Sequence, residues 1–383
     1  MKSPAALDVL QSTKLLDPVS AIPVSRPDSG LLGGVVYPGS LHRKGRELFA
    51  IVREQGVKIL LIAGPDADPG RDFKGSVFDG GTVRCKLAPF SEVNAAALRA
   101  AFPWAGPVSL SSRQTTFGCG DRLGRATPGH IRAARRFKVA PVLAQQSIRE
   151  LTLTGRTFRG VLDDVTFLVF QAGYRDGYGA DADHLKSLDH IRMALATGMT
   201  MITLDLSEVM RPEVARLSAA EVTRLYDALP ADIRRRVDRD YAGKAISLAA
   251  AAGKADIRFT PEDARLCAAM YTPALDFARE VYQLLCAQRG EGNFDLEMSI
   301  DETTTPTLPA HHLFIIRELQ ARGVKVVSLA PRFIGEFQKG IDYIGDLAEF
   351  ERQFKTHVVI AQAHGDYKIS IHSGSDKFSI FPT

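Results

Sequence analysis

From about residue 106 to the end of this 383-residue chain, short apolar segments alternate with helical patterns, and this alternation constrains the fold more than any other feature. A short apolar run bounded by turn residues is typical of a buried strand, and apolar residues three and four apart indicate a helix. Regular alternation of the two is typical of an α/β protein with a parallel sheet. Eight such strands predict a closed TIM-like (β/α)8 barrel. They are expected at residues 108–116, 139–144, 166–171, 200–206, 294–300, 324–329, 357–362 and 368–372.

Helical patterns fill most of the intervals between these strands, among them residues 182–197, 308–322 and 345–354. One interval is much longer than the others, because residues 207–293 separate the fourth expected strand from the fifth. Within it, helical patterns lie at residues 219–229, 231–240 and 261–289. We therefore predict a helical insertion at residues 207–293, on one face of the barrel.

The region before the barrel, residues 1–105, is expected to form an N-terminal cap. Residues 1–40 are rich in proline, serine and glycine, which is typical of irregular chain. A helical pattern at 46–55 precedes an apolar strand at 57–63, so the rest of the cap is expected to be a small α/β region. At the other end, the chain stops at Thr383, where a barrel needs a closing helix. We expect from this that the barrel, residues 106–383, is C-terminally truncated.

The composition restricts the classes of function. A formal net charge of +4 is compatible with small anionic substrates but is too weak to indicate a nucleic-acid partner. The four cysteines form no C-x-x-C pair, which is typical of a reduced protein and indicates neither a zinc knuckle nor a redox dithiol. No uninterrupted apolar segment resembles a signal sequence or a transmembrane helix. We expect a cytoplasmic protein without a membrane partner, and whether it forms a homo-oligomer stays open.

The fifth expected strand carries a row of acidic residues. Strand side chains alternate between faces, so one face presents polar residues and the other presents apolar ones. The apolar face is expected to meet the helices, which directs the polar face into the barrel. Buried carboxylates without a cation or a proton are unfavourable. The row therefore predicts a metal site with Glu297 as a ligand; its members are Asp295, Glu297, Ser299 and Asp301.

Two histidines follow the last two expected strands. His364 comes after the seventh and His372 ends the eighth, at the strand ends where barrels hold functional residues. Two imidazoles and a carboxylate suit Zn²⁺, Mn²⁺, Ni²⁺ or Co²⁺ better than Mg²⁺. We predict that Glu297, His364 and His372 bind one such divalent cation. The alternative is that the histidines are not ligands, and if their rings lie far apart, His184 is the replacement ligand.

Two glycine-rich loops contain further polar candidates. Residues 117–130 include Arg122 and either approach a ligand or form a tight loop before a helix. Gln171, at the end of the third expected strand, precedes a loop that contains Asp183 and His184. There, Asp183 either takes part in chemistry or caps a helix whose first turn exposes His184. The spacing of the acidic residues does not fit a calcium-binding loop.

Several of these segments carry a specific combination of motifs: GDRLG and ATPGH within 120–130, GADADHLK at 179–186, SIDETTTPT at 299–307, LAPRF at 329–333, HGDYK at 364–368 and HSGSDK at 372–377. Together they resemble the tagaturonate/fructuronate epimerase family, over the chain from about residue 30 to its end. The resemblance implies a divalent metal, a uronate ketose substrate and epimerisation at C4. Family members continue beyond the equivalent of Thr383, which again indicates a truncated chain.

Inversion at C4 of a 2-ketose is consistent with retro-aldol chemistry. The proton on C4 is not acidic, because C4 is not adjacent to the C2 carbonyl, whereas the C3–C4 bond is an aldol bond. Cleavage gives an enediolate and an aldehyde, and re-addition after rotation of the aldehyde inverts C4. We expect a metal to act as the Lewis acid and Asp183 or Asp301 to move the O4 proton. The substrate-binding candidates are Arg122, Lys368 and Lys377 for the carboxylate, together with His184 and Gln171.

Other functions are compatible with the same features. A metal-dependent aldolase or a ketose isomerase would use the same kind of site and would differ in its products. A non-catalytic basic binding protein would use the arginine-rich runs at 132–136 and 234–236, although a solvated helix face is the usual explanation of such runs. No G-x-G-x-x-G lies between a strand and a helix, so we expect activity without added NAD.

Overall fold

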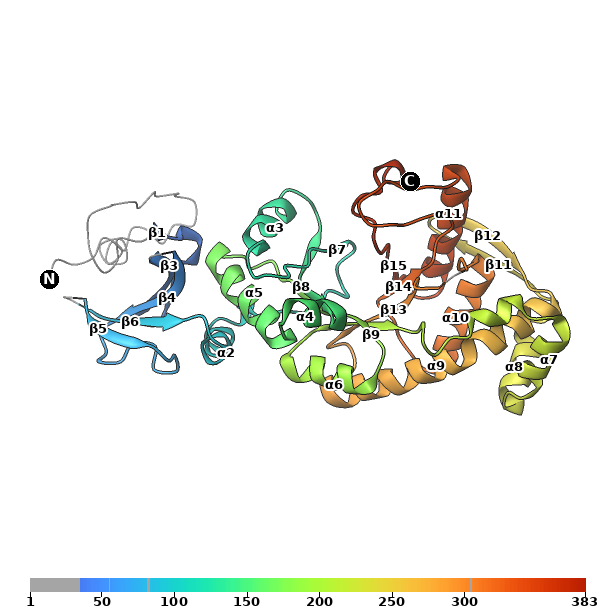
Figure 1. Cartoon of the computed structure of the whole chain (residues 1–383), viewed down its shortest axis with the longest axis horizontal. Helices are drawn as coiled ribbons and strands as arrows, with labels where there is room; N and C mark the ends of the chain where they lie inside the picture. The colour runs from blue at the N-terminus through green and yellow to red at the C-terminus, as the bar shows by residue number, and fades with distance from the viewer. Residues whose placement is uncertain (1–34, 55, 81–82, 304) are drawn as a thin grey trace. The chain divides into compact units, whose positions relative to one another are not determined.

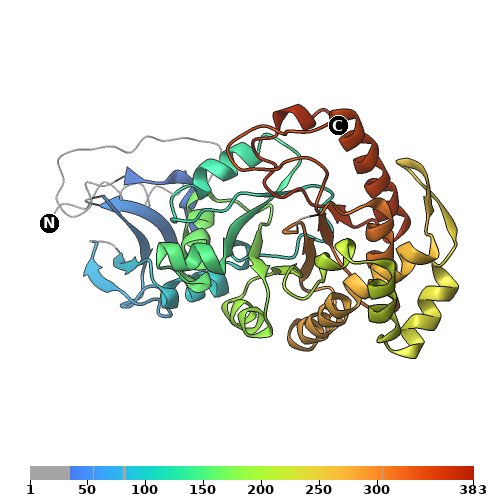
Figure 2. The same cartoon turned by 45° about the vertical axis from the view of Figure 1, so that its right-hand side comes forward.

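The computed structural model describes residues 35–54, 56–80, 83–303 and 305–383, so most of the expected irregular segment, residues 1–34, lies outside the described residues. The chain forms two compact units. Unit 1 contains the described residues up to Ala182 together with Ala194–Thr200, and unit 2 contains Asp183–Met193 together with Met201–Thr383. The blue-to-red colouring of Figures 1 and 2 follows the chain through both units.

Unit 1 begins with an antiparallel sheet in the strand order β1-β3-β4-β6-β5, with β2 also paired to β3. On one face, Phe49, Ile51 and Leu60 pack in the same core as Leu98 of helix α2 (Glu92–Ala101). The expected strand at 57–63 is confirmed as β4. The strands are β1 (Val35–Val36), β2 (His42–Lys44), β3 (Glu47–Glu54), β4 (Val57–Gly64), β5 (Ser76–Asp79) and β6 (Arg84–Pro89).

The helix expected at residues 46–55 is wrong, because this segment forms strand β3. Phe49 and Ile51 belong to the core on the α2 face of the sheet, whereas Ala50 and Val52 belong to a second core on the other face. The segment therefore buries apolar side chains on both faces. Pairing with β1, β2 and β4 satisfies its backbone, and this tertiary context outweighs the local helical pattern.

Unit 1 also contains β7 (Thr116–Gly118), β8 (Ala140–Ser147) and the first half of β9 (Gly179–Leu185), with β8 in the middle. β7 and β8 are parallel. β7 begins only where the expected strand 108–116 ends, whereas β8 matches the strand expected at 139–144. The helices of this part are α3 (Thr127–Ala134), α4 (Ile148–Thr154) and α5 (Phe158–Ala172).

The strand expected at residues 166–171 is also wrong, because these residues lie inside helix α5. The Thr157 side chain accepts a hydrogen bond from the backbone N–H of Gly160 at the start of α5, and the helix ends at Gly173 with a φ of 57°. Eleven of the fifteen residues of α5 are buried. A helix buried on nearly every side has a continuous apolar run, which periodicity does not distinguish from a buried strand.

Unit 2 contains the second half of β9 followed, in sheet order, by β10, β13, β14 and β15. The pairs from β10 to β15 are parallel. Among the described residues the sheet has seven strands, in the order β15-β14-β13-β10-β9-β8-β7, instead of the eight strands expected for a closed barrel. The α/β class is confirmed. The strands are β10 (Met201–Asp205), β13 (Asp295–Ile300), β14 (Ser328–Pro331) and β15 (Lys368–Ile369).

The strand expected at residues 357–362 is wrong, because it is the second half of helix α11 (Leu347–Ala363). The Asp346 carboxylate caps α11 by accepting hydrogen bonds from two backbone N–H groups. The β-branched residues near its end favoured a strand in the sequence. In the structure they continue a helix that packs against α10 (Pro309–Ala321) and against the hairpin of β11 (Ala245–Ala250) and β12 (Gly253–Arg258).

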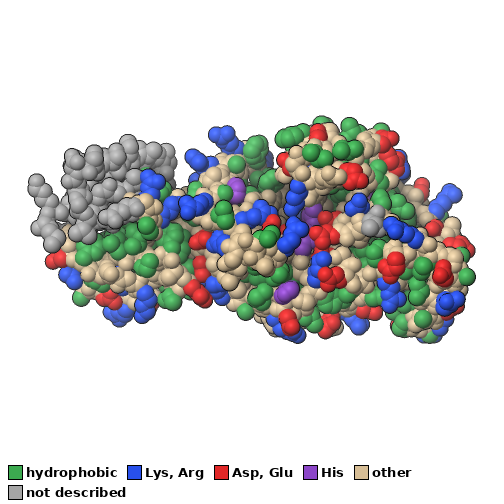
Figure 3. All heavy atoms as spheres, viewed as in Figure 1, with side chains coloured by type: hydrophobic (Ala, Val, Ile, Leu, Met, Phe, Trp, Pro, Cys, Tyr) green, Lys and Arg blue, Asp and Glu red, His purple; other side chains and the backbone are tan. Residues whose placement is uncertain are grey.

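The three helices expected in the insertion are present as α7 (Ala219–Asp227), α8 (Ala231–Asp240) and α9 (Pro261–Arg289). Ser218 and Thr260 form capping boxes at the starts of α7 and α9. The β11–β12 hairpin between α8 and α9 was not expected. Among the described residues, no helix combines the length and the apolar character needed to cross a membrane. Acidic and basic side chains are interspersed on the face shown in Figure 3, in agreement with the small net charge.

Candidate metal centre

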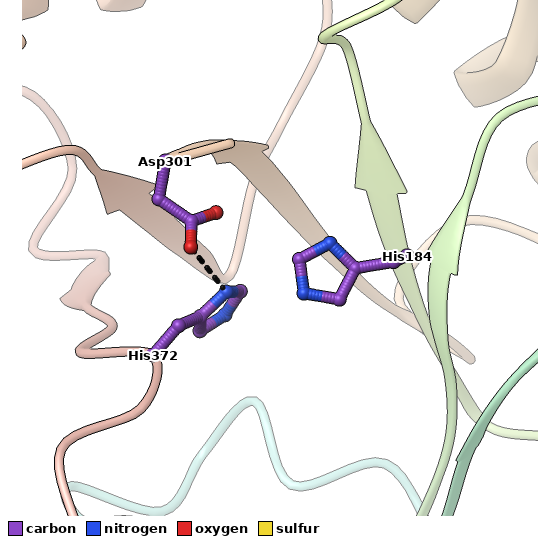
Figure 4. Close-up of side chains that lie close together, drawn as sticks. All are labelled: His184, Asp301 and His372. Atoms are coloured by element: carbon purple, nitrogen blue, oxygen red, sulfur yellow. Dashed lines mark ion pairs between the residues drawn. The ribbon is translucent and has the colours of Figure 1, made fainter. Parts of the chain in front are cut away.

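Three polar side chains of unit 2 meet beyond the carboxyl ends of its strands. His184 lies on β9, Asp301 directly follows β13, and His372 follows β15. Each offers one ligand atom, and these atoms lie within 4.8 Å of one another. The two imidazole rings are 5.0 Å apart between centroids. Figure 4 shows the three side chains pointing toward one another, with the Asp301 carboxylate beside the ring of His372. Two imidazoles and a carboxylate are a donor set suited to a transition-metal cation.

Glu297 lies behind His372. The His372 Nε2–H donates to Oε1 of Glu297 at 2.8 Å, and the Ser328 hydroxyl donates to Oε2 at 2.5 Å. Nδ1 of His372 is thereby left to face Asp301, whose Oδ2 lies 3.2 Å away. A carboxylate on the far nitrogen is the usual support of a metal-binding histidine. Glu297, expected as a ligand, belongs to neither candidate ligand group of the described residues.

Three buried polar atoms at this site have no hydrogen-bond partner among the described residues. They are Nδ1 of His184, Nδ1 of His372 and Oδ2 of Asp205, the last residue of β10. Nδ1 of His184 lies 3.4 Å from Oδ2 of Asp205, which is close enough for an ion pair but lacks the geometry of a hydrogen bond. Buried polar atoms are nearly always satisfied. Since Nδ1 of His184 and Oδ2 of Asp205 face each other, it is Nδ1 of His372, within the first group, that best fits a cation site.

The surrounding acids give the site a strongly negative character. Burial by itself lowers the pKa of His184, but Asp205 and Asp183 more than offset this and raise that pKa to about 9. Burial also lowers the pKa of His372, but hydrogen bonds and charge interactions with Asp301 and Glu297 outweigh burial and raise this pKa well above its ordinary value. Protons on these rings therefore compensate the carboxylates when no other cation does so.

A second group of potential ligands consists of His184, Asp205 and Glu302. It already has a counter-ion, because Nζ of Lys186 lies 3.4 Å from Oδ2 of Asp205 and 3.7 Å from Oε2 of Glu302. The Lys186 ammonium would repel a metal ion placed among the same oxygens. The group of His184, Asp301 and His372 therefore fits a cation better.

The backbone at the cluster adopts an unusual conformation. His184 has a φ of 52° and Ser373, next to His372, also has a φ of 52°. Residues other than glycine seldom occupy this left-handed region, and each such residue costs about 1–3 kcal/mol. Such conformations concentrate at functional sites. The His184 ring, which extends from one of these two residues, points toward the other members of the cluster (Figure 4).

A cavity of about 220 Å³ adjoins the cluster within unit 2. Asp301 and His372 line one side of it, and residues of the segment after β14 line another. The latter include Arg332, Phe333 and Gln338. A small concave site beside convergent polar groups is the arrangement expected of a small-molecule binding site.

The other expected residues of unit 2 have different surroundings. Asp183 lies next to the cluster, with Oδ1 3.6 Å from Nε2 of His184. His364 does not follow a strand but ends helix α11, where Nδ1 bonds to the backbone oxygen of Ile360 at 2.9 Å. Among the described residues it belongs to neither candidate ligand group. Lys368 begins β15 and is half-buried, and burial lowers its pKa although Asp295 and Glu297 oppose this.

Lys377 is fully buried, and its ammonium is already engaged. It donates to the backbone oxygens of Gln338 and Ile341, each at 2.6 Å. Asp376 accepts a hydrogen bond from the backbone N–H of Gly340 in the same segment. Lys377 was expected to pair with a substrate carboxylate, whereas its contacts fasten the segment that forms a wall of the cavity.

The two expected residues of unit 1 have different surroundings. Arg122 forms an ion pair with Glu150 at 2.7 Å. Gln171 lies in α5 instead of at a strand end, and its side-chain oxygen is buried without a hydrogen-bond partner among the described residues. Sequence reasoning missed the part that Asp205 and Arg332 take in the site, although both follow the rule that strand ends carry functional residues.

Comparisons with known proteins agree with one another. Residues 37–383 match a protein family described as tagaturonate epimerase, UxaE. A curated protein of Thermotoga maritima, named tagaturonate/fructuronate epimerase, is 42% identical over 351 residues, which are 91% of this chain and 70% of that protein. Two crystal structures of the fructuronate-tagaturonate epimerase UxaE from Cohnella laeviribosi, one native and one with a bound glycerol, are 42% identical to this chain. Each has a TM-score of 0.84 and matches 91% of this chain and 69% of the other. This chain therefore belongs to the tagaturonate epimerase family.

Proposed function

We propose that this chain is a C4-epimerase that interconverts D-tagaturonate and D-fructuronate with one divalent cation held by His184, Asp301 and His372. Family membership supports the reaction, since the curated relative from T. maritima is named for it. The observation that carries the cation is the meeting of two imidazoles and a carboxylate whose ligand atoms lie within 4.8 Å of one another, with the buried Nδ1 of His372 left without a hydrogen-bond partner among the described residues.

The donor set favours Zn²⁺, Mn²⁺, Ni²⁺ or Co²⁺ over Mg²⁺, because imidazole nitrogen suits the former cations and Mg²⁺ prefers oxygen ligands. When bound, the cation would supply a Lewis acid for the C2 carbonyl of the ketose. Glu297 positions His372 through the 2.8 Å hydrogen bond to Nε2 and is therefore a supporting residue in this proposal.

Inversion at C4 proceeds by breaking and remaking the C3–C4 bond. A base removes the O4 proton, O4 becomes the oxygen of an aldehyde at C4, and the C3–C4 bonding electrons give an enediolate across C2 and C3. Rotation about the C4–C5 bond turns the other face of the aldehyde toward the enediolate. Carbon C3 of the enediolate then attacks C4 on that face. The base then returns its proton to O4, so the step needs no net oxidant, reductant or water.

We assign proton transfer at O4 to Asp183. Asp301, the other candidate, is itself a proposed ligand; its Oδ1 accepts a hydrogen bond from Ser299 at 2.5 Å, and its Oδ2 lies 3.2 Å from His372. Asp183 adjoins His184 in the chain but is not a member of either ligand group of the described residues. A half-buried carboxylate beside the cluster is suited to exchange a proton with a substrate hydroxyl.

Elemental analysis of the purified chain and NMR of tagaturonate in D₂O test this function. We expect one transition-metal ion per chain, loss of activity after chelation with recovery on adding metal back, and formation of fructuronate. Since C4 keeps its hydrogen throughout bond cleavage, we expect no deuterium at C4 of the product. Deuterium at that carbon would contradict the retro-aldol route and indicate simple deprotonation.

Two further measurements separate the alternatives. An aldolase would release the two three-carbon fragments, which the same NMR spectra would detect, whereas an epimerase recombines them. An epimerase that oxidises C4 transiently would need a bound nucleotide. Stoichiometric NAD in the supernatant of the denatured protein would therefore overturn the proposed bond cleavage.

A further inference from the structure

Arg332 lies where the strands of unit 2 present their functional residues. β14 ends at Pro331, so Arg332 is the first residue beyond the strand, beside the carboxyl end of β13, the strand that Asp301 follows. Its backbone is held on both sides by Thr307: the Arg332 N–H donates to Oγ1 of Thr307 at 3.1 Å, and the Thr307 N–H donates to the oxygen of Arg332 at 2.8 Å. These two hydrogen bonds fix the backbone position from which the long Arg332 side chain extends.

The next residue anchors the same position. Phe333 is buried in a hydrophobic cluster with Tyr343, Phe350 and Ile380. The Arg332 side chain lines the cavity together with Asp301 and His372. The chain thus presents one arginine to the cavity from a short segment that is fixed at both ends.

Among the described residues, the guanidinium of Arg332 has no carboxylate partner. Its Nε is buried and has no hydrogen-bond partner among the described residues. In the described part of the chain, no carboxylate oxygen lies within 4.0 Å of the Arg332 guanidinium, the limit for an ion pair. Most buried arginines are paired, as Arg236 and Arg322 are with Glu318. A buried N–H without an acceptor costs about 1–3 kcal/mol, so the arrangement is expected to be retained for an acceptor that arrives from outside the chain.

We infer that Arg332 binds the terminal carboxylate of the ketose acid and makes the site select sugar acids over neutral ketoses. This inference rests on the proposed function, because it concerns the same cavity. The planar fork of an arginine matches a carboxylate with two parallel hydrogen bonds, which a lysine does not reproduce. The metal cluster and Arg332 then bind opposite ends of one substrate, the keto end and the acid end.

The other basic candidates are less suited to this role. The ammonium of Lys377 donates hydrogen bonds to two backbone oxygens, and the residue is fully buried. Arg122 already has the Glu150 carboxylate at 2.7 Å. Lys368 lies at the start of β15, near Asp295 and Glu297, instead of at the strand end that faces the cavity. Among these residues only Arg332 lines the cavity.

The inference is tested with Arg332→Gln and Arg332→Lys, with Arg352→Gln as the control. Arg352 is an exposed arginine of α11 that pairs with Glu349 and lies outside the cavity lining. For metal-loaded Arg332→Gln we expect the KM for tagaturonate to rise about 100-fold, the loss typical of a charge-assisted hydrogen-bonded pair. Arg332→Lys is expected to recover only part of this loss, and the control is expected to match the unsubstituted protein.

A binding measurement separates this inference from the proposed function. Gluconate and its neutral counterpart sorbitol are titrated calorimetrically into each metal-loaded protein, with metal content and melting temperature measured alongside. We expect the preference for gluconate over sorbitol to disappear in Arg332→Gln while metal content and melting temperature stay unchanged. An unchanged preference in this variant would overturn the inference even if epimerisation is intact. Loss of the preference in a protein that does not epimerise would support Arg332 and reject the proposed function.

Discussion

At the residue scale, His184 combines a ring that belongs to the candidate ligand group with a backbone φ of 52°. Most substitutions there would alter two properties at once, because side chains other than those of asparagine, aspartate and histidine rarely adopt this conformation. Asparagine retains the tolerance for the left-handed region but lacks an imidazole. The effect of the ring can therefore be separated from that of the backbone at this position.

We expect His184→Asn to keep the fold and to lose bound metal. Since a direct ligand is removed, kcat/KM should fall by more than about 100-fold, the upper range for groups that only support a ligand. Metal content by elemental analysis and the melting temperature measure the two properties. His190→Asn, on helix α6 (Leu188–Thr197), is the matched control and should retain its metal. Full metal occupancy in His184→Asn would exclude the residue as a ligand.

Glu297 supports His372 without belonging to either ligand group of the described residues. Glu297→Gln keeps the shape but weakens the acceptor for the Nε2–H, so we expect the metal to bind about 10–100-fold more weakly. At saturating metal the stoichiometry should still be one ion per chain. Competition with a chelator of known affinity measures both quantities. If no metal binds at any concentration, Glu297 is a ligand, as its position in the sequence first indicated.

At the scale of elements, a buried chain of hydrogen bonds connects α10, α11 and β15. Nδ1 of His312 on α10 lies 2.9 Å from Nδ1 of His357 on α11, and Nε2 of His312 lies 2.5 Å from the Tyr367 hydroxyl next to β15. Burial lowers the pKa of His357 to about 4 and that of His312 well below its ordinary value. Both rings are therefore neutral in the folded protein near neutral pH.

This lowered pKa predicts a loss of stability in acid. Between pH 6.5 and about 4, the unfolded chain binds a proton at His357 that the folded chain does not, so the free energy of unfolding falls as the pH falls. His357 alone should contribute about 3 kcal/mol to this loss. Denaturant unfolding at pH 7 and pH 4.5 measures it, and His357→Asn should show a smaller difference between the two. An equal difference in both proteins would contradict the assignment.

Which elements the sequence predicts depends on how locally they are determined. Helices α7 and α9 carry capping boxes, and the strand β10 is a short apolar run, so local signals suffice for them. The sequence predicted strands where α5 and the end of α11 form. These predictions are wrong because the two apolar runs are helical as a result of the capped helix starts and of burial on several sides. β9 was missed because GADADHL contains no apolar run.

The residues of the candidate site also divide into those that local sequence signals identify and those that depend on tertiary contacts. The alternating face of β13 is enough to find Asp301 and Glu297, and the position of His372 after a strand follows from the chain order. The sequence could not show that Glu297 contacts Nε2 of His372, since that contact depends on the side from which His372 approaches. His364 was misplaced together with the strand expected before it, and the position of His184 in the candidate ligand group depends on the unrecognised strand β9.

At the scale of the whole molecule, the chain passes between its two units three times. It leaves unit 1 after Ala182, returns for Ala194–Thr200 and then continues into unit 2. The returning segment contributes to unit 1: the Thr200 N–H donates to the oxygen of Ala180 at 2.9 Å, and Arg159 donates to the oxygen of Ala196 at 2.9 Å. Neither unit is a continuous piece of sequence.

This connectivity bears on the order of events at the ribosome. A nascent chain that has emerged only as far as Ala182 lacks the partner of Ala180 and the segment that α5 contacts, so unit 1 has to wait for Thr200 before its contacts are complete. By then the residue that bends the backbone at φ 52°, His184, has already been synthesised. Its remaining partners in the candidate ligand group, Asp301 and His372, are added more than a hundred residues later, so these three side chains can meet only after His372 has been synthesised.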